Sequence, residues 1–231
     1  MAAAPGVSRT AFERGSFAAL VEPQHWPALQ WMGRVRSFPR GSLLMFAGET
    51  DERVMVLLEG RVKVTLAAAD GQETVVSIRG PGEIVGELPC LEERPQLGSV
   101  RALEPARALV LDARSFRDYI ATTPQAAFAL LEVLSRQLRD AVLKRAEFSS
   151  SDTIGRLAAR LVELAERYGT ASERGLVIGL PLSQEELAGW VGASHAGLAK
   201  ALQVLRELGW IKTERRRIIV SDLEALRSRS A

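Results

Sequence analysis

The spacing of apolar residues changes twice along this chain and divides it into three segments. In the first, residues 12–114, the apolar runs are short and separated by glycines, which is typical of an all-β domain. Val62, Val64 and Leu66 alternate with polar neighbours, so we expect one face of that strand to be buried. An Asp-Gly pair at 70–71 is a strong hairpin signal. This segment therefore predicts a small barrel or jelly roll.

The second segment, residues 115–148, has the period of a helix, which we expect Pro124 to break. Its apolar positions recur with 4-3 spacing over three heptads, which is typical of a helix that pairs with another helix. We therefore expect a dimerisation helix, although a helix that packs only against its own barrel is the alternative. The residues expected at the dimer interface are Leu131, Leu134, Leu138, Ala141, Arg145 and Phe148.

The polar residues 149–152 interrupt that pattern and place the hinge between two domains there. The third segment, residues 152–231, begins with a helix predicted over 153–168. Further along, Ser183 can cap a helix, and Glu186 lies three residues later, where its carboxylate can reach back to the cap amide. A second helix therefore starts at this serine.

The pattern after that start predicts a winged helix-turn-helix. Gly192 permits a tight turn after the helix, and Ser194 can cap the next one. The apolar positions of this next helix keep the 3.6-residue period and are Leu198, Leu202, Leu205 and Leu208. Gly209 ends the helix, and two strands follow, with the arginines 215–217 in the hairpin between them. That hairpin is the predicted wing.

Charge placement connects this module with DNA. The net charge of the whole chain is only +2, so the argument depends on a local excess. Residues 195–217 contain six Lys or Arg and two Glu, an excess of +4. Phosphates attract such a surface, and side chains near the helix start can reach base edges in the major groove. A basic run can also be ordinary solvated surface. The candidate DNA-binding residues are Ser183, Gln184, Ser194, His195, Ala196, Gly197, Lys200, Arg215 and Arg216.

Composition argues against several functional classes. Cys90 is the only cysteine, so one chain can form neither a disulfide nor a Cys-ligated zinc or iron–sulfur site. With two histidines far apart in sequence and no phosphate-cradling P-loop, we expect no enzyme activity and no metal site. No apolar run reaches about 18 residues and the first residues do not form a signal peptide. We therefore expect a cytoplasmic protein without a membrane partner.

With a β-roll, a long helix and a winged helix in this order, the chain resembles the CRP/FNR family of bacterial transcription regulators across nearly its whole length. The matching stretches are residues 85–88 (VGEL), 100–105 (VRALEP), 152–158 (DTIGRLA), 184–188 (QEELA) and 191–194 (VGAS). The resemblance implies an α+β fold with an N-terminal cyclic-nucleotide-binding-type β-roll, a dimerisation helix and a C-terminal winged helix-turn-helix. It also implies a homodimer on palindromic double-stranded DNA, with RNA polymerase as a further partner.

The ligand pocket departs from the family pattern. Members that bind cyclic AMP hold the ribose with a glutamate and the cyclic phosphate with an Arg-Ser or Arg-Thr pair. That pair falls here on Gln96 and Leu97, which supply no positive charge. The positions that usually offer hydroxyls to the adenine fall on Ala141 and Val142, whose side chains cannot form hydrogen bonds. The resemblance thus implies a degenerate pocket formed by Gly86, Glu87, Leu88, Gln96, Leu97, Gln137, Ala141 and Val142.

We therefore expect that cyclic AMP is not bound in the usual way. The chain is then either independent of a ligand or tuned to one that depends less on its phosphate. Arg94 could replace the lost guanidinium or be a surface arginine, and the retained Gly86 and Glu87 could bind a ligand or only shape the turn. Haem ligands cannot be assembled from His25 and Cys90, so we expect neither haem nor an iron–sulfur cluster.

The DNA face also departs from the family pattern. The family's Arg-Glu pair falls on His195 and Ala196, and its later arginine falls on Lys200. Arginine–guanine and glutamate–cytosine contacts are each worth roughly 1 to 3 kcal/mol. We therefore expect a palindrome read with altered or looser specificity. The alternatives are a regulator that responds to cyclic nucleotides or another small effector through a non-standard pocket, and an architectural DNA-binding protein of low specificity.

Overall fold

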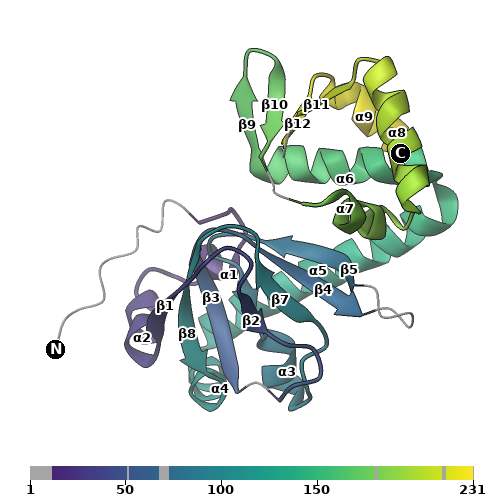
Figure 1. Cartoon of the computed structure of the whole chain (residues 1–231). Coiled ribbons are helices and arrows are strands. Elements are labelled where there is room, and N and C mark those ends of the chain that lie inside the picture. Colours follow the sequence, from purple (N-terminus) through teal and green to yellow (C-terminus); the bar gives the residue numbers. More distant parts are fainter. Residues whose placement is uncertain (1–11, 51, 68–72, 180–181, 215–216, 231) are drawn as a thin grey trace. The chain divides into compact units, whose positions relative to one another are not determined.

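The computed structural model describes residues 12–50, 52–67, 73–179, 182–214 and 217–230. The chain forms two compact units, Met1–Arg139 and Asp140–Ala231. A roll of two sheets, a long helix and a winged helix-turn-helix follow one another along the chain (Figure 1). The predicted α+β fold class is therefore confirmed.

Two four-stranded antiparallel sheets form the roll of the first unit. One sheet has the order β1-β8-β3-β6 and the other has the order β2-β7-β4-β5. The strands of the first sheet are β1 (Arg34–Phe38), β3 (Arg53–Glu59), β6 (Ile84–Val85) and β8 (Ala106–Asp112). The strands of the second are β2 (Leu43–Met45), β4 (Val62–Ala67), β5 (Glu73–Arg79) and β7 (Ser99–Ala102).

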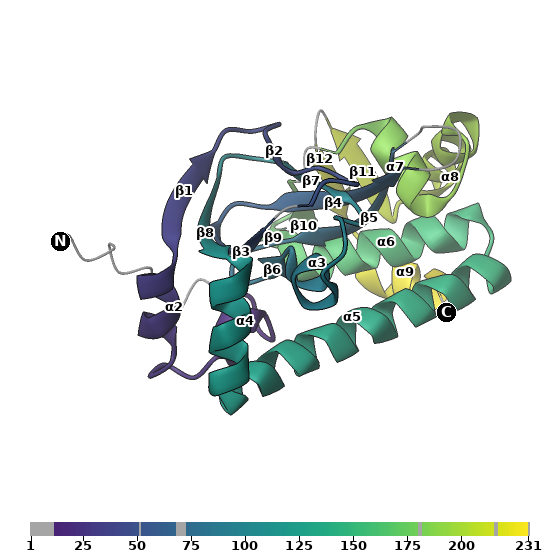
Figure 2. The ribbon, with the colours of Figure 1, turned by 90° about the horizontal axis from the view of Figure 1, so that it is seen from below.

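Alternating side chains of β3 supply two separate apolar clusters. Met55 and Leu57 point into the cluster between the sheets, whereas Val54 and Val56 point to the opposite face, where helices pack. Figure 2 shows α2 and α4 side by side at this face, in agreement with their contacts to each other and to β8. The helices of this unit are α1 (Phe17–Leu20), α2 (Trp26–Met32), α3 (Glu87–Glu92), α4 (Ala113–Thr122) and the first part of α5 (Pro124–Ser150).

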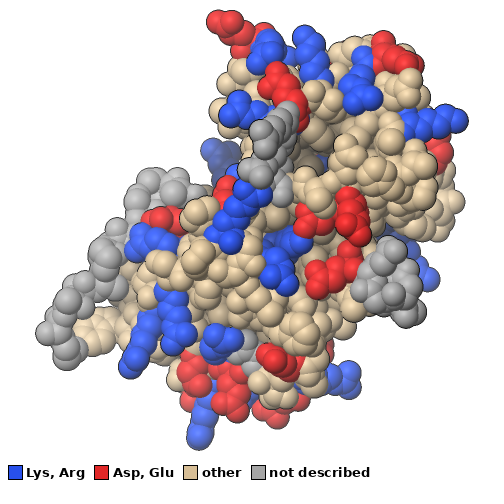
Figure 3. Space-filling view, viewed as in Figure 1, with Lys and Arg blue, Asp and Glu red and all other residues tan. Residues whose placement is uncertain are grey.

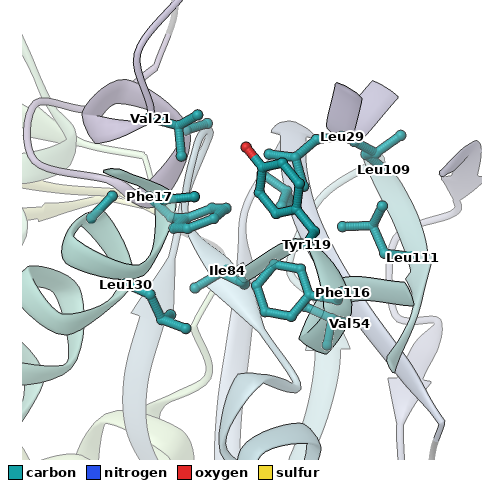
Figure 4. Packing of buried hydrophobic residues seen from close by; sticks show 14 of the residues in the cluster. Phe17, Val21, Leu29, Val54, Ile84, Leu109, Leu111, Phe116, Tyr119 and Leu130 are labelled. Carbon is teal, nitrogen blue, oxygen red and sulfur yellow. The ribbon is translucent and has the colours of Figure 1, made fainter. Parts of the chain in front are cut away.

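Aromatic residues pack in the apolar cluster between the first sheet and the helices (Figure 4). The rings of Phe17 and Phe116 meet edge to face, with centroids 5.9 Å apart, and both side chains are fully buried. Leu130 of α5 belongs to the same cluster. The start of α5 is therefore part of the roll's own core.

The alternation predicted for β4 is only partly right, because Val62 is buried but Val64 and Leu66 are half-buried, whereas the polar Lys63 and Thr65 are buried. Thr65 of β4 was expected on the open face of the strand, but only 2% of it is exposed. Its hydroxyl lies 3.2 Å from Glu73 Oε2 and 3.5 Å from the Ser99 carbonyl oxygen, so hydrogen bonds compensate for its burial. The hairpin expected at residues 70–71 lies outside the described residues.

The helix break predicted at Pro124 is confirmed. α4 ends at Thr122, and α5 begins at the proline, which lacks an N–H that the first helical turn does not need. The dimerisation helix was predicted over residues 115–148, and the structure divides that range between α4 and α5. Phe116 and Tyr119 of α4 are buried in the roll, so the long helix starts about one turn after them.

The second unit surrounds a sheet with the order β11-β12-β10-β9. Its first complete helix, α6 (Thr153–Tyr168), has the bounds that the sequence predicted. The strands β9 (Gly169–Ser172) and β10 (Gly175–Ile178) and the helix α9 (Leu223–Ser230) were not predicted. The remaining elements are α7 (Gln184–Val191), α8 (His195–Glu207), β11 (Ile211–Glu214) and β12 (Arg217–Val220).

The two units divide within α5, between Arg139 and Asp140, upstream of the hinge predicted at 149–152. The reason is a set of ion pairs between the last turns of α5 and α6. Lys144 Nζ lies 3.2 Å from Glu163 Oε1, and the buried Arg160 bonds to both Glu147 and Glu163. A buried guanidinium needs such partners, so these turns of α5 pack as part of the second unit.

Candidate DNA interface and ligand cavity

The first helix of the predicted helix-turn-helix begins with a complete capping box. The Glu186 backbone N–H donates to Ser183 Oγ at 3.0 Å, and the Ser183 N–H donates to Glu186 Oε2 at 2.6 Å. Both bonds satisfy amides that a helix start leaves without a partner. The predicted start of α7 is confirmed, and Leu187 and Val191 are buried on its inner face.

The turn after α7 depends on a left-handed glycine. Gly192 has φ +64°, a conformation that L side chains rarely adopt, and its N–H donates to the Gly189 carbonyl at 3.1 Å. Ser194 then caps α8, because its hydroxyl accepts the Gly197 N–H at 3.1 Å. Both local predictions are confirmed, and they fix where the second helix starts.

The start of α8 presents a largely exposed surface. Ser194, His195, Ala196 and Lys200 are exposed, and Gly197 is half-buried. The inner face of the helix carries the buried residues Leu198, Leu202 and Leu205. Ser183 and Gln184, the other described candidates for DNA contact, are also exposed. Leu208, predicted on the inner face, is instead 52% exposed, because the helix ends there and Leu208 is its C-terminal cap.

The wing is an antiparallel pair of β11 and β12. Arg215 and Arg216 lie outside the described residues. Arg217, predicted in the hairpin, is the first residue of β12 and pairs with Glu214 across the wing. Figure 3 shows Lys and Arg on both units, not gathered into one continuous patch on the visible face. The charge argument therefore rests on local positions around α8 and the wing.

A contact that the sequence reasoning missed joins the end of α5 to this turn. Arg156 of α6 donates from Nε to the Val191 carbonyl at 2.7 Å and from Nη2 to the Gly192 carbonyl at 3.3 Å. Its guanidinium also lies over the Phe148 ring, 4.7 Å from the ring centroid. A Cβ on Gly192 would lie 2.1 Å from that ring. We call this group of Phe148, Arg156, Val191 and Gly192 the turn clamp.

The turn clamp gives Phe148 a contact within its own chain. The heptad pattern assigned this residue to the dimer interface, and that stays a prediction, because 58% of Phe148 is exposed beside the contact with Arg156. The aromatic residue at the end of the heptads and the glycine of the turn were both visible in the sequence. Their contact was not, because it joins positions 44 residues apart through the fold.

Helix α5 has a second apolar face that the described residues leave uncovered. One face of the helix is buried and carries Ala126, Ala129, Leu130 and Val133. On the other side the exposed fractions are 60% for Leu131 and 67% for Leu138, while Ala141 and Arg145 are also exposed and Leu134 is half-buried. A helix that packed only against its own roll would not need this second stripe.

A cavity of about 160 Å³ opens in the roll between β4, β5, β7 and α3. Six of the predicted pocket residues line it: Gly86, Glu87, Leu88, Gln96, Leu97 and Gln137. Ala141 and Val142 are not among the described lining residues and fall in the second unit. Arg94, the suggested replacement for the phosphate-binding arginine, is exposed and does not line the cavity either.

Glu87 is the buried acid of this cavity. Gln137 Nε2 donates to its Oε1 at 3.4 Å, and only 5% of the residue is exposed. Burial raises the pKa of Glu87 above its ordinary value, and the nearby charge of Arg79 opposes that rise. Gly86, with φ +82°, precedes it, and a Cβ there would lie 2.7 Å from the Arg53 carbonyl oxygen. The glycine is therefore required by the turn itself.

Gln96 occupies the place where the family pattern has an arginine. It is 6% exposed, and its Nε2 lies 3.3 Å from Met45 Sδ. Its backbone pairs with the neighbouring loop, since its N–H donates to Glu49 and its carbonyl accepts from Gly48. The position is thus packed and uncharged, and Leu97 beside it is 71% exposed.

Comparisons with known proteins agree with both parts of this site. The family model for the cyclic nucleotide-binding domain matches residues 35–123, and the one for the Crp-like helix-turn-helix domain matches residues 155–229. A CRP-like cAMP-activated global transcriptional regulator of Mycobacterium tuberculosis is 35% identical over 210 residues, covering 91% of this chain and 94% of the relative. The cAMP-activated regulator CRP of Salmonella typhimurium is 26% identical over 206 residues, covering 87% and 97%.

Solved structures show the same architecture. A CRP-family transcriptional regulator of Thermus thermophilus has a TM-score of 0.72 at 26% identity and covers 84% of this chain and 96% of its own. The c-di-GMP responsive regulator CLP of Xanthomonas campestris has a TM-score of 0.75 at 20% identity, covering 86% and 99%. The fold and the two matched domains define a DNA-binding transcription regulator. The chain belongs to the CRP/FNR family, as the sequence motifs indicated.

Neither a membrane-spanning helix nor a cluster of metal-ligating side chains is found among the described residues. No helix there is both long and apolar enough to cross a membrane. Within the same ranges, no group of three or more His, Cys, Asp or Glu side chains is placed to hold a metal ion. The relatives above are named as transcription regulators and not as enzymes.

The turn clamp leads to a prediction about DNA binding. Arg156→Ala removes the bonds to two turn carbonyls, and we expect about a 10-fold loss of DNA affinity because the start of α8 is then less well positioned. Arg156→Lys should recover only part of the loss, since an ammonium cannot make the same forked contacts. Fluorescence anisotropy with a selected DNA site measures the effect. The exposed Arg40 provides the control variant, and equal affinities for Arg156→Ala and Arg40→Ala would refute a positioning role.

Proposed function

We propose that this chain acts as a homodimer that binds a palindromic promoter site and regulates transcription without the usual dependence on cyclic AMP. The observation that carries the DNA part is the exposed start of α8, capped by Ser194 directly after the left-handed Gly192. A helix start held in this way can enter a major groove. Two copies related by a two-fold axis would read the two halves of a palindrome.

The uncovered stripe of α5 supports the homodimer. Its exposed leucines recur with heptad spacing, which suits the same face of a second copy. A surface groove of about 570 Å³ lies beside the stripe and is lined in part by Leu20, Phe128 and Leu131. The second copy is the occupant with matching chemistry, because an apolar stripe on one helix fits the equivalent stripe of another.

Base recognition should depend on a different set of side chains from the family's usual one. His195 and Lys200 can donate to guanine, and Ser194 can donate to a phosphate. Ala196 cannot accept from cytosine as the family's glutamate does. The resulting specificity is altered or looser, and a low-specificity architectural role is the second candidate, favoured by this alanine.

The ligand part of the proposal rests on Gln96. Two relatives bear names that describe them as cAMP-activated. In this chain the side chain at the phosphate position is buried and uncharged and contacts Met45, so a cyclic phosphate in the family's usual place would lack its cationic partner there. The chain is then either active without a ligand or responsive to a different one through the non-standard pocket. The DNA-bound dimer would act by contact with RNA polymerase.

The DNA proposal predicts the outcome of site selection from random duplexes. The selected sites should be palindromic but should differ from the family's TGTGA half-site. Lys200→Ala should weaken binding to the selected site by about 5- to 150-fold, corresponding to roughly 1 to 3 kcal/mol, and relax specificity at one base pair. Arg34→Ala, in the first unit, is the charge-matched control. Recovery of TGTGA would disprove altered specificity, and a uniform footprint would favour the architectural role.

The dimer proposal predicts that paired charges in the α5 stripe separate the subunits. Leu131→Asp combined with Leu138→Asp should convert a dimer into a monomer, because the acids of both copies would face one another in an apolar contact. Analytical ultracentrifugation measures the change. Leu208→Asp, which alters a similarly exposed leucine outside the stripe, should remain dimeric. A wild-type monomer, or a double variant that stays dimeric, would contradict the proposed interface.

The ligand proposal predicts no micromolar binding of cyclic AMP in calorimetry of the wild-type chain. Combining Gln96→Arg with Leu97→Ser should create measurable binding, because these changes supply the positive charge and the hydroxyl that a cyclic phosphate needs. Leu97→Ser alone is the matched control and should not bind. Micromolar affinity in the unmodified chain would disprove this part of the proposal and leave the DNA part untouched.

A further inference from the structure

The roll's cavity contains a cation that the family pattern does not use. Among the described lining residues, Arg79 and Glu87 are the charged ones. Arg79 is the last residue of β5 and pairs with Val62 of β4 in the sheet, so its position is fixed by the strand. Its side chain is 17% exposed. The positive charge missing at Gln96 is therefore present elsewhere in the same cavity.

Arg79 is only loosely engaged by protein groups. Its Nη1 lies 3.3 Å from Glu83 Oε1, longer than the 2.7 to 2.9 Å typical of charge-assisted bonds. The other carboxylate oxygen of Glu83 is bound at 2.6 Å to the Gly80 N–H. A guanidinium has five N–H donors, and within the described part of the chain Arg79 makes one long side-chain contact, so most of its capacity is left for a ligand.

The rest of the cavity sets limits on what that ligand can be. A volume of about 160 Å³ is below the roughly 300 to 1,000 Å³ of sites for drug-sized molecules, which favours a small compound. Most of the wall is apolar, formed by residues such as Val64, Val76 and Ile84. Glu87 and its neighbour Gln137 supply acceptors for a hydroxyl or an amine.

We propose that Arg79 is the anion-binding residue of the cavity and that its ligand is a small organic acid carrying a hydroxyl or amine. The carboxylate or phosphate of the ligand would bind the guanidinium, and its donor group would bind Glu87. This assignment rests on the proposed function, because it names the class of effector that replaces cyclic AMP. It differs from the family arrangement in that the charge comes from β5 and not from the loop before β7.

Thermal unfolding of the full chain with two acids and their neutral counterparts tests this assignment. Glycerol 3-phosphate is compared with glycerol, and 2-hydroxyisocaproate is compared with 2-hydroxyisocaproamide. At least one acid at millimolar concentration should raise Tm by about 3 °C or more, while its neutral counterpart should not. The responding acid then distinguishes a phosphate ligand from a carboxylate ligand.

Variants then locate the binding. Arg79→Leu and the more conservative Arg79→Gln should weaken the affinity for the responding acid by about 10- to 150-fold, whereas Arg94→Leu, a change outside the cavity, should leave it unchanged. Circular dichroism checks that each variant folds. The assignment is overturned if neither acid raises Tm, if the neutral counterparts act equally, or if the rise persists in the folded Arg79 variant. The affinity of the same proteins for the selected palindrome is measured as well. If the palindrome is still bound while the ligand test fails, the assignment of Arg79 is wrong and the proposed DNA-binding function stands.

Discussion

The contact of Arg156 with the turn between α7 and α8 is the interaction on which the DNA-facing part of this protein depends. One guanidinium holds the carbonyls of Val191 and Gly192 and lies over the ring of Phe148. The last carbonyls of a helix have no partner within that helix, so a side chain that binds them also fixes where the helix ends. The direction of α8 follows from that fixed end and from the left-handed glycine after it.

Ion pairs with α6 explain why α5 continues past the boundary between the two units. The turns of α5 after Arg139 pack with α6 through Lys144 and Glu147, whereas the turns before it belong to the core of the roll. One continuous helix therefore packs in the core of the roll at its start and forms ion pairs with α6 near its end. Helix α5 is the part of the chain that links the roll to the second unit. A ligand in the roll would therefore change DNA binding only if it favoured one arrangement of the contacts of α5 over another.

The sequence predicted best what short-range hydrogen bonds determine. The capping box at Ser183, the left-handed Gly192 and the cap at Ser194 involve residues at most four positions apart, and all three are confirmed. What depends on tertiary packing was not predicted: the buried Phe116 makes α4 part of the roll's core, although the break after it at Pro124 was expected. The strands β9 and β10 were missed because they are short and because β10 pairs with β12, far along the sequence.

The ligand cavity shows why a motif can indicate a place without identifying its chemistry. The residues around Glu87 and Gln96 were located correctly from the order of the family motifs, since loop length places them beside one another. Arg79 was not singled out, because in sequence it is an ordinary strand end and only the sheet turns it toward the cavity. A charge inside a largely apolar wall is unfavourable without a counter-ion. Glu83, at 3.3 Å, and the nearby charge of Glu87 offset part of that penalty, and the proposed anionic ligand would offset more of it.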